Sequence, residues 1–267
     1  MKNILVTYYM SREARENLTA SIPGNFTFHT HPTKEELQSA DVVVGEPSNA
    51  QLDDMKSDAS LITLDKKQNY RIPVYSFYDS LTERASDWML ASILEHVFRF
   101  PEYIAAQKHC DWAPLLDRSL RKMNVVSVGD DEISHLLAKK LAMLGCDLQI
   151  ENTIDDIVLM SADVLCLHAL ANDASYRVLS TELLKKMKSG ALLINCGSGS
   201  AVNEDDLVSV VHDGHSIHAC LDQTSVIPLP RNHPLWSMDG VRLTPQAVFN
   251  PSSPAFISFI GETLNHD

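Results

Sequence analysis

The fold is decided by the stretch Val125-Val126-Ser127-Val128-Gly129-Asp130-Asp131-Glu132-Ile133-Ser134 and by the helical apolar pattern that continues to Leu144. The first four residues predict a buried strand, Gly129 predicts a tight turn, and the following pattern predicts a helix. This order is typical of the opening unit of a dinucleotide-binding fold, in which helices cover a doubly wound parallel sheet.

The turn itself departs from the usual G-x-G-x-x-G sequence. The second glycine of that motif lets the backbone approach a pyrophosphate, and the third lets helix and strand pack closely. Here Asp131 and Ser134 stand at those positions, and only Gly129 remains. A carboxylate about 5 Å from a doubly charged pyrophosphate, at an effective dielectric of about 20, would cost roughly 6 kcal/mol, or about four decades of affinity. The turn therefore predicts that no dinucleotide binds.

The same acidic residues suit a helix without a ligand. Asp130, Asp131 and Glu132 come where unpaired N–H groups and the helix dipole favour negative charge, so we expect the chain to cap this helix with its own carboxylates. Magnesium coordination is the alternative, but three successive acids on a first turn point in different directions. We expect no metal here.

Composition indicates an ordinary soluble α/β protein of two domains. The chain has 267 residues, with 22 basic and 35 acidic side chains and a net charge of −13, which excludes nucleic acid and anionic membranes as partners. The start at Met1 runs directly into an apolar strand pattern, and no apolar stretch is long enough to cross a bilayer, so we predict a cytoplasmic protein.

Cysteine and histidine spacing indicates no metal centre. The five cysteines are odd in number and lack C-x-x-C spacing, which favours free thiols. His212, His215 and His218 recur every third residue, but Gly214 interrupts the helix, and the spacing then enters a strand. We interpret these histidines as a solvated turn.

Alternating strand and helix patterns divide the chain into two α/β domains. The smaller one comprises residues 1–84 and 251–267, the latter forming a final helix after Pro251. A flavodoxin-like sheet is predicted for it from apolar runs at Ile4–Thr7, Thr27–His29, Val42–Val44, Leu61–Leu64 and Pro73–Ser76. Residues 85–250 form the Rossmann-type nucleotide-binding domain. One long helix is predicted from Ser80 to Lys108.

Several motifs resemble the D-2-hydroxyacid dehydrogenase family, closest to its glyoxylate and hydroxypyruvate reductase branch. The resemblance runs from about Ala40 to Val248 and is carried by Ala40-Asp41-Val42-Val43-Val44-Gly45-Glu46-Pro47, Ser161-Ala162-Asp163-Val164, Leu184-x-x-Met187-Lys188-x-Gly190-Ala191-x-Leu193-Ile194-Asn195, Leu221-Asp222, His233-Pro234-Leu235-Trp236 and Leu243-Thr244-Pro245. It implies an NAD(P)-dependent oxidoreductase fold.

The resemblance also implies a catalytic arginine, glutamate and histidine, and all three are replaced. The arginine clamps the substrate carboxylate, the histidine transfers a proton, and the glutamate raises the histidine pKa. Their positions carry Ser198, Ile227 and Gln246. A hydroxyl cannot form a bidentate ion pair, and an amide is neither acid nor base near neutral pH.

Other departures agree with this loss. A short segment from Asp65 to Arg71 replaces the expected substrate loop, and Leu170 stands where a proline is expected. The family-equivalent residues that remain are Asp222, Asn195, His168 and Glu151, and Glu151 stands where an acid would hold the adenosine ribose. Gly129, Asp131, Ser134, Glu151 and Asn195 thus form a degenerate cofactor site.

Three functional classes follow. The first is a pseudoenzyme: a binding or regulatory protein with no NAD(P), whose interdomain cleft near Ser198, Asp222 and Gln246 holds a small molecule. The second is an atypical NAD(P)-dependent oxidoreductase acting on a small 2-hydroxy or 2-keto acid, in which Gln246 orients the substrate and Asp222 or His168 moves the proton. The third is a purely structural dimer partner.

The family dimerises through the long helix that joins its domains. The resemblance therefore implies a homodimer, or a heterodimer with an active paralogue, through the helix Ser80–Lys108. The apolar residues expected at that contact are Leu90, Ile93, Leu94, Val97, Phe98 and Trp112.

Overall fold

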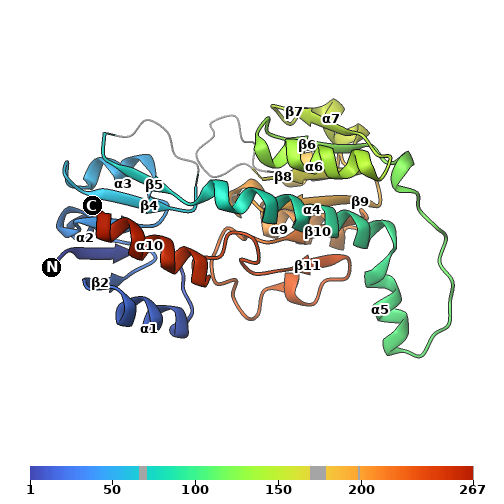
Figure 1. Ribbon diagram of the computed structural model, residues 1–267. Coiled ribbons are helices and arrows are strands. Elements are labelled where there is room, and N and C mark those ends of the chain that lie inside the picture. The colour runs from blue at the N-terminus through green and yellow to red at the C-terminus, as the bar shows by residue number, and fades with distance from the viewer. Residues whose placement is uncertain (66–70, 169–178, 198, 267) are drawn as a thin grey trace. The chain divides into compact units, whose positions relative to one another are not determined.

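The computed structural model describes residues 1–65, 71–168, 179–197 and 199–266. These residues form two α/β units, each with its own parallel sheet (Figure 1). One unit comprises Met1–Leu81 with Phe249–Asp267, and the other comprises Thr82–Val248. The sequence placed the boundaries after residues 84 and 250.

The first unit has strand order β2-β1-β3-β4-β5, the 2-1-3-4-5 arrangement of flavodoxin-like sheets. Its strands are β1 (Asn3–Val6), β2 (Asn25–Phe28), β3 (Val42–Val44), β4 (Ser60–Thr63) and β5 (Val74–Ser76). Its helices are α1 (Arg12–Ser21), α2 (Lys34–Ser39), α3 (Asn49–Asp54), the 3-10 helix η1 (Tyr78–Leu81) and α10 (Pro254–His266). The final helix belongs to this unit.

Side-chain capping sets the starts of three of these helices. Ser11 accepts a hydrogen bond from the Ala14 N–H, and Thr33 and Ser48 each form a complete capping box. Such caps satisfy N–H groups that have no partner inside the helix. The short helix α3 was not predicted, because it contributes only one buried residue, Leu52, and so lacks an apolar period.

The second unit has strand order β11-β10-β9-β8-β6-β7, and all pairs are parallel. Its strands are β6 (Val125–Val128), β7 (Leu148–Glu151), β8 (Val164–Leu167), β9 (Ala191–Asn195), β10 (Ile217–Leu221) and β11 (Val241–Leu243). The chain adds β7 on one side of β6 and then β8 on the other, so the order in which strands are added reverses between β6 and β8. In doubly wound sheets, ligands bind at the carboxyl ends of the strands at such a point.

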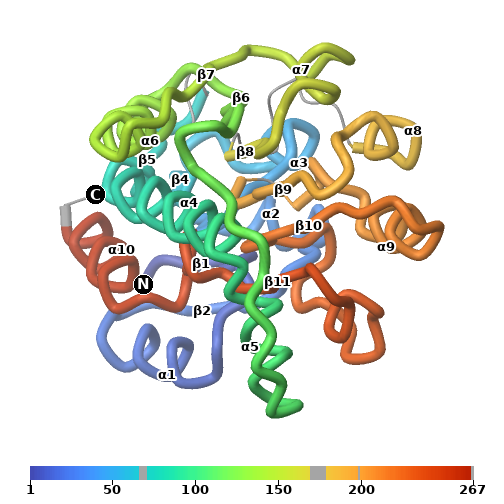
Figure 2. Tube along the Cα trace, turned by 90° about the vertical axis from the view of Figure 1, so that its right-hand side faces the viewer, coloured from blue at the N-terminus to red at the C-terminus, as the bar shows by residue number. Residues whose placement is uncertain are grey.

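Helices cover both faces of this sheet. Figure 2 shows α4 (Thr82–Val97) and α6 (Glu132–Met143) on one face and α8 (Thr181–Leu184) and α9 (Glu204–His212) on the other. The remaining elements are α5 (Phe100–Lys108), α7 (Asp156–Ser161) and the 3-10 helices η2 (Leu120–Lys122), η3 (Gly199–Ala201) and η4 (Pro234–Trp236). Alternate strand residues pack into the core on the α7–α9 side, among them Val126, Val128, Leu165, Leu193 and Leu221. No described helix is both long and apolar enough to span a membrane.

The prediction of a single long helix from Ser80 to Lys108 is wrong. It is divided into α4 and α5, because Pro101 lies in the first turn of α5 and cannot donate a hydrogen bond to the turn before it. Arg99 takes the left-handed conformation at the break, with φ of 56°. Ile93 and Val97 are buried in the core of their own unit, which removes them from the expected dimer contact, whereas Phe98 and Trp112 are 58% and 96% exposed.

A titratable cluster holds the segment after α5 against α4. The guanidinium Nη1 of Arg118 lies 3.0 Å from Nε2 of His96, and the His96 and His218 rings meet with centroids 4.9 Å apart. Burial, followed by the nearby charge of Arg118, lowers the pKa of His96 to about 3. Burial also lowers the pKa of His218. Both imidazoles are therefore neutral at physiological pH.

The His96 pKa predicts how stability changes with pH. Since the unfolded histidine has a pKa near 6.5 and the folded one a pKa of about 3, the unfolded chain binds more protons between these values. The free energy of unfolding should fall as pH drops from 6.5 toward 3, by as much as about 5 kcal/mol from this group. Urea unfolding across this window should show that the free energy of unfolding changes less steeply with pH for His96→Gln than for the wild type. His212 is exposed, so His212→Gln should keep the pH dependence of the wild type. Equal pH dependence in the two variants would show that His96 is not its source.

Candidate functional site

The carboxyl ends of four neighbouring strands bring the predicted site residues together. Gly129 follows β6, His168 follows β8, Asn195 ends β9 and Asp222 follows β10. The strands are in register at this edge, where Leu167 lies opposite both Val128 and Asn195. Parallel strands that end at one edge necessarily gather the residues that follow them. The residues singled out in the sequence therefore lie at one edge of one sheet.

Asp131 is the N-cap of α6, as predicted. Its Oδ1 accepts a hydrogen bond from the backbone N–H of Ser134 at 3.2 Å. Gly129 has φ of +118°, which side-chain-bearing residues rarely adopt, and a Cβ added there would lie 2.9 Å from Cε1 of His168. The first turn of the helix is therefore closed by the chain's own carboxylate and packed against an imidazole.

Ser134 and His168 form a buried polar connection beneath this turn. Ser134 Oγ donates to the Gly129 carbonyl at 2.6 Å and lies 2.8 Å from His168 Nε2 and 2.9 Å from Ser127 Oγ. The other ring nitrogen, Nδ1, lies 3.3 Å from Asp131 Oδ2 but without hydrogen-bond geometry. Ser134 and His168 are both 0% exposed, so Asp131, His168 and Ser134 make a closed structural network and not an accessible nucleophile.

Burial and nearby carboxylates make Cys196 unreactive. Its pKa is well above the usual thiol value, chiefly because of burial and then because of the charge of Asp222. The reactive form of cysteine is the thiolate, which this environment disfavours. Asn195 beside it is fully buried, and its Oδ1 accepts from the Gly197 N–H at 3.2 Å. These two residues shape the loop after β9.

Asp222 organises the turn after β11. Its carboxylate accepts from the backbone N–H groups of Ala247 at 2.7 Å and Val248 at 3.1 Å, and from Thr244 Oγ1 at 3.1 Å. The Gln246 N–H donates to the Asp222 carbonyl at 2.9 Å, and Gln246 has φ of 55°. Asp222 is 2% exposed. It is therefore a buried acceptor of backbone hydrogen bonds.

The positions expected to carry catalytic groups contribute no charged side chain. Gln246 makes no side-chain hydrogen bond to any described residue, and Ile227 is a half-buried apolar residue before Pro228. Ser198 lies outside the described residues, as does Leu170. A Cβ added to the neighbouring Gly199 would collide with the Thr224 carbonyl, so the loop approaches this strand connection closely.

Glu151 stands at the end of β7, as predicted, with its Oε1 accepting from Gln149 Nε2 at 2.7 Å. Asp130 contacts His135 instead, with Oδ1 2.9 Å from Nε2. Across the described parts of the chain, no three His, Cys, Asp or Glu side chains are grouped as a metal site. His215 and His218 face different partners, the Met187 carbonyl and the His96 ring.

Sequence reasoning missed Glu204. This residue is 6% exposed in the first turn of α9, and its carboxylate accepts from the Ser225 N–H at 2.5 Å and from Ser225 Oγ at 2.6 Å. It thereby fixes the loop that leads from Asp222 to Ile227. An acid at the start of a helix is common, so nothing in the sequence marked Glu204 as a long-range contact.

Residues 90–247 match the NAD binding domain of the D-isomer specific 2-hydroxyacid dehydrogenases. The chain belongs to this family.

Two known proteins are similar to this chain in sequence. Glyoxylate/hydroxypyruvate reductase A of Citrobacter koseri is 24% identical over 266 residues, which cover 91% of this chain and 83% of that protein. An uncharacterized protein in the proB 3′ region of Corynebacterium melassecola is 46% identical over 84 residues, 32% of this chain and 28% of that protein.

Solved structures show the same fold. A probable 2-hydroxyacid dehydrogenase from Rhizobium etli in complex with NADP matches with a TM-score of 0.70, 21% identity and coverage of 99% and 93% of the two chains. An NAD-dependent formate dehydrogenase from Staphylococcus aureus in complex with NAD matches with a TM-score of 0.76, 16% identity and coverage of 100% and 95%.

Asp222→Ala should destabilise the protein. The change leaves the Ala247 and Val248 N–H groups without their acceptor in a buried turn, at a cost of about 3 kcal/mol or more. Asp205→Ala, at a carboxylate that is 93% exposed, should change stability by less than about 0.5 kcal/mol. Urea unfolding of both variants measures the difference, and equal stabilities would show that Asp222 does not hold the turn.

Proposed function

We propose that this family member has lost hydride transfer and works as a binding or regulatory protein. One observation carries the proposal: the N-terminus of α6, where relatives of this fold place a dinucleotide pyrophosphate, is capped by the carboxylate of Asp131. The turn does not fit the cofactor, because its anion position already holds a negative charge that is covalently part of the chain.

The arrangement around the cap adds to this argument. The imidazole of His168 packs against Gly129, and the Ser134 hydroxyl bonds both the Gly129 carbonyl and that ring. Moving Asp131 aside would leave the Ser134 N–H without its acceptor and would take away the carboxylate that lies 3.3 Å from His168 Nδ1. Pyrophosphate binding would therefore have to offset both this rearrangement and the electrostatic repulsion.

The side chains at the family's catalytic positions support the same conclusion. Ile227 and Gln246 supply neither the acid that raises a histidine pKa nor the histidine itself. The site edge between Asp222 and Gln246 instead presents backbone groups and a neutral amide. It suits a neutral small molecule better than a 2-keto acid, whose carboxylate needs a cation.

The alternative is an atypical NAD(P)-dependent oxidoreductase, which the NADP- and NAD-bound structural relatives make the natural comparison. In it Asp222 or His168 would move the proton. Both side chains are buried, at 2% and 0% exposure. Asp222 accepts backbone N–H groups, and His168 contacts Ser134. A proton-transfer group must reach the substrate. The oxidoreductase alternative therefore requires the edge of the sheet to open first.

Calorimetric titration of NADH and NADPH tests the proposal. The wild type should show no binding up to millimolar concentration in low salt. Asp131→Asn should bind measurably, because asparagine caps a helix about as well as aspartate while removing the charge. Asp131→Gly should behave similarly with a less stable helix.

Micromolar binding by the wild type would overturn the proposal. Oxidation of NADH in the presence of glyoxylate, hydroxypyruvate or pyruvate would then establish the oxidoreductase alternative. If the protein binds the cofactor but shows no turnover, it is a dinucleotide-binding regulator. That result also contradicts the proposed loss of cofactor binding.

We also propose that the chain assembles as a homodimer, with a heterodimer containing an active paralogue as the alternative. Support comes from apolar residues left exposed on α5 and its flanking segments: Phe98, Phe100, Tyr103, Ile104, Trp112 and Leu116. Phe98 and Phe100 stack, with ring centroids 5.9 Å apart. Contiguous exposed apolar surface of this kind marks interaction sites.

Trp112→Asp and Leu116→Asp should weaken this assembly by at least tenfold, because each places a charge on the apolar surface. Sedimentation velocity at tens of micromolar should give a dimer for the wild type and mainly monomer for the variants. Ile157→Asp on α7, a side chain of 76% exposure, is the matched control and should remain dimeric. A monomeric wild type would exclude the homodimer.

A further inference from the structure

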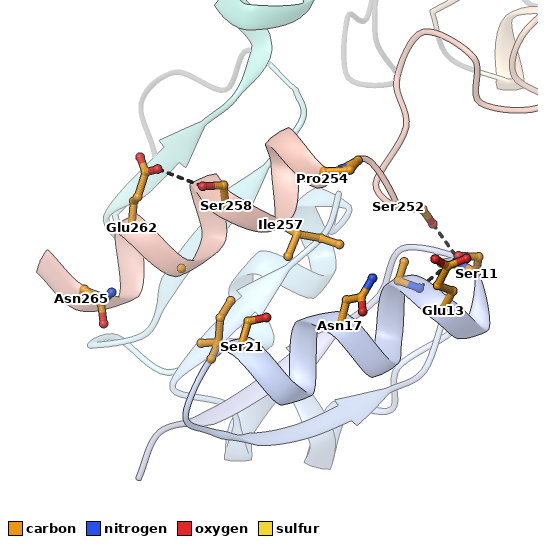
Figure 3. Close-up of a pocket in the computed structure, with 13 residues that line it drawn as sticks. Ser11, Glu13, Asn17, Ser21, Ser252, Pro254, Ile257, Ser258, Glu262 and Asn265 are labelled. Atoms are coloured by element: carbon orange, nitrogen blue, oxygen red, sulfur yellow. Dashed lines mark hydrogen bonds between the residues drawn. The ribbon is translucent and has the colours of Figure 1, made fainter.

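A groove runs between α1 and α10 in the first unit, away from the sheet edge considered above (Figure 3). It encloses about 650 Å³, within the range of about 300 to 1,000 Å³ that is usual for small-molecule sites. The Ser11 N–H donates to Ser252 Oγ at 2.9 Å near one end of the groove. The groove therefore has a defined end and walls from two helices.

Small side chains leave the space between the two helices open. Ala14 and Ser21 of α1 line one wall, and Ser258 and Gly261 of α10 line the other. Gly261 leaves this part of the wall without a side chain. A Cβ at this position would lie 3.4 Å from the Ile22 side chain. A larger residue would occupy the groove.

The lining carries negative charge without compensation. Glu13 and Glu262 contribute carboxylates, and none of the described lining residues is Lys, Arg or His. The whole chain carries a net charge of −13. Phosphates and carboxylates are thus excluded, including the keto acids of the family, and the groove favours a neutral or cationic ligand.

Several exposed polar side chains line the groove, and most of them have no hydrogen-bond partner among the described residues. The side chains of Glu13, Asn17, Ser21 and Asn265 make no hydrogen bond to any described residue, and Glu262 accepts only from Ser258 Oγ, at 3.0 Å. Figure 3 shows Glu13 beside Ser11 at one end, and Glu262 and Asn265 toward the other. Apolar surface from Ala14, Ile22 and Ile257 lies among these groups.

We propose that this groove binds an aliphatic diamine or polyamine. Its ammonium groups would pair with the carboxylates of Glu13 and Glu262, and its methylene chain would cover the apolar surface between them. Asn17, Ser21 and Asn265 supply further acceptors for ammonium N–H groups. This assignment does not depend on whether the chain binds NAD(P).

Titration calorimetry with spermidine tests the assignment, with triethylene glycol as a neutral probe of similar build. Spermidine should bind saturably and the glycol should not. Asn17→Lys places a cation in the groove and should weaken spermidine binding at least tenfold. Ala20→Lys, an exposed position on the same helix outside the groove, makes the same charge change and should have little effect.

Removal of single carboxylates gives an independent check. Glu13→Gln and Glu262→Gln should each weaken binding about fivefold, whereas Glu16→Gln, which lies outside the groove and pairs with Arg12 at 2.7 Å, should not. Equal losses for Asn17→Lys and Ala20→Lys would show non-specific attraction to an acidic protein. That result, equal binding of the glycol, or no saturable spermidine binding would overturn the proposal.

Discussion

The hydrogen bond from the Ser134 N–H to the Asp131 carboxylate is the interaction on which the candidate site depends. The first turn of α6 has N–H groups without partners inside the helix, and something negative or polar must satisfy them. In a nucleotide-binding protein that partner comes from the ligand. Here the chain itself supplies an acceptor, the Asp131 carboxylate, for one of these N–H groups.

This local solution extends into the core of the second unit. Ser134 occupies the position where glycine would permit close packing, and its hydroxyl joins the Gly129 carbonyl to the buried His168 ring. Position 129 favours glycine for two reasons: its φ is +118°, and a Cβ there would lie 2.9 Å from the His168 ring. The turn, the helix cap and the end of β8 are therefore one packed polar unit. A substitution in one of them changes the hydrogen bonding of the others.

Different residues maintain the fold and the proposed site. The parallel sheet depends on apolar runs such as Val125–Val128 and Ala191–Asn195, which are fully buried. Asp222 has a structural role in this chain, because it accepts hydrogen bonds from the backbone of the turn after β11. The side chains of Ile227 and Gln246 have no comparable hydrogen-bonding role among the described residues, so a substitution at either position should cost less stability. Membership of a dehydrogenase family therefore does not by itself establish hydride transfer.

The sequence by itself determined the two sheets, most strand positions and the acidic helix cap, and it supplied the proposal that Ile227 and Gln246 stand at catalytic positions of the family. Those features are local, since strand periodicity, capping chemistry and motif spacing act over a few neighbouring residues. Only the tertiary structure decided that His168 faces inward onto Gly129, that Glu204 holds Ser225, and that Ile93 and Val97 belong to the core. It also divided the predicted long helix at Arg99 and opened the groove beside Gly261. Apart from the helix break, which has a local cause in Pro101, each of these depends on contacts between residues distant in sequence or on the packing of neighbouring elements, and side-chain type alone does not specify such contacts.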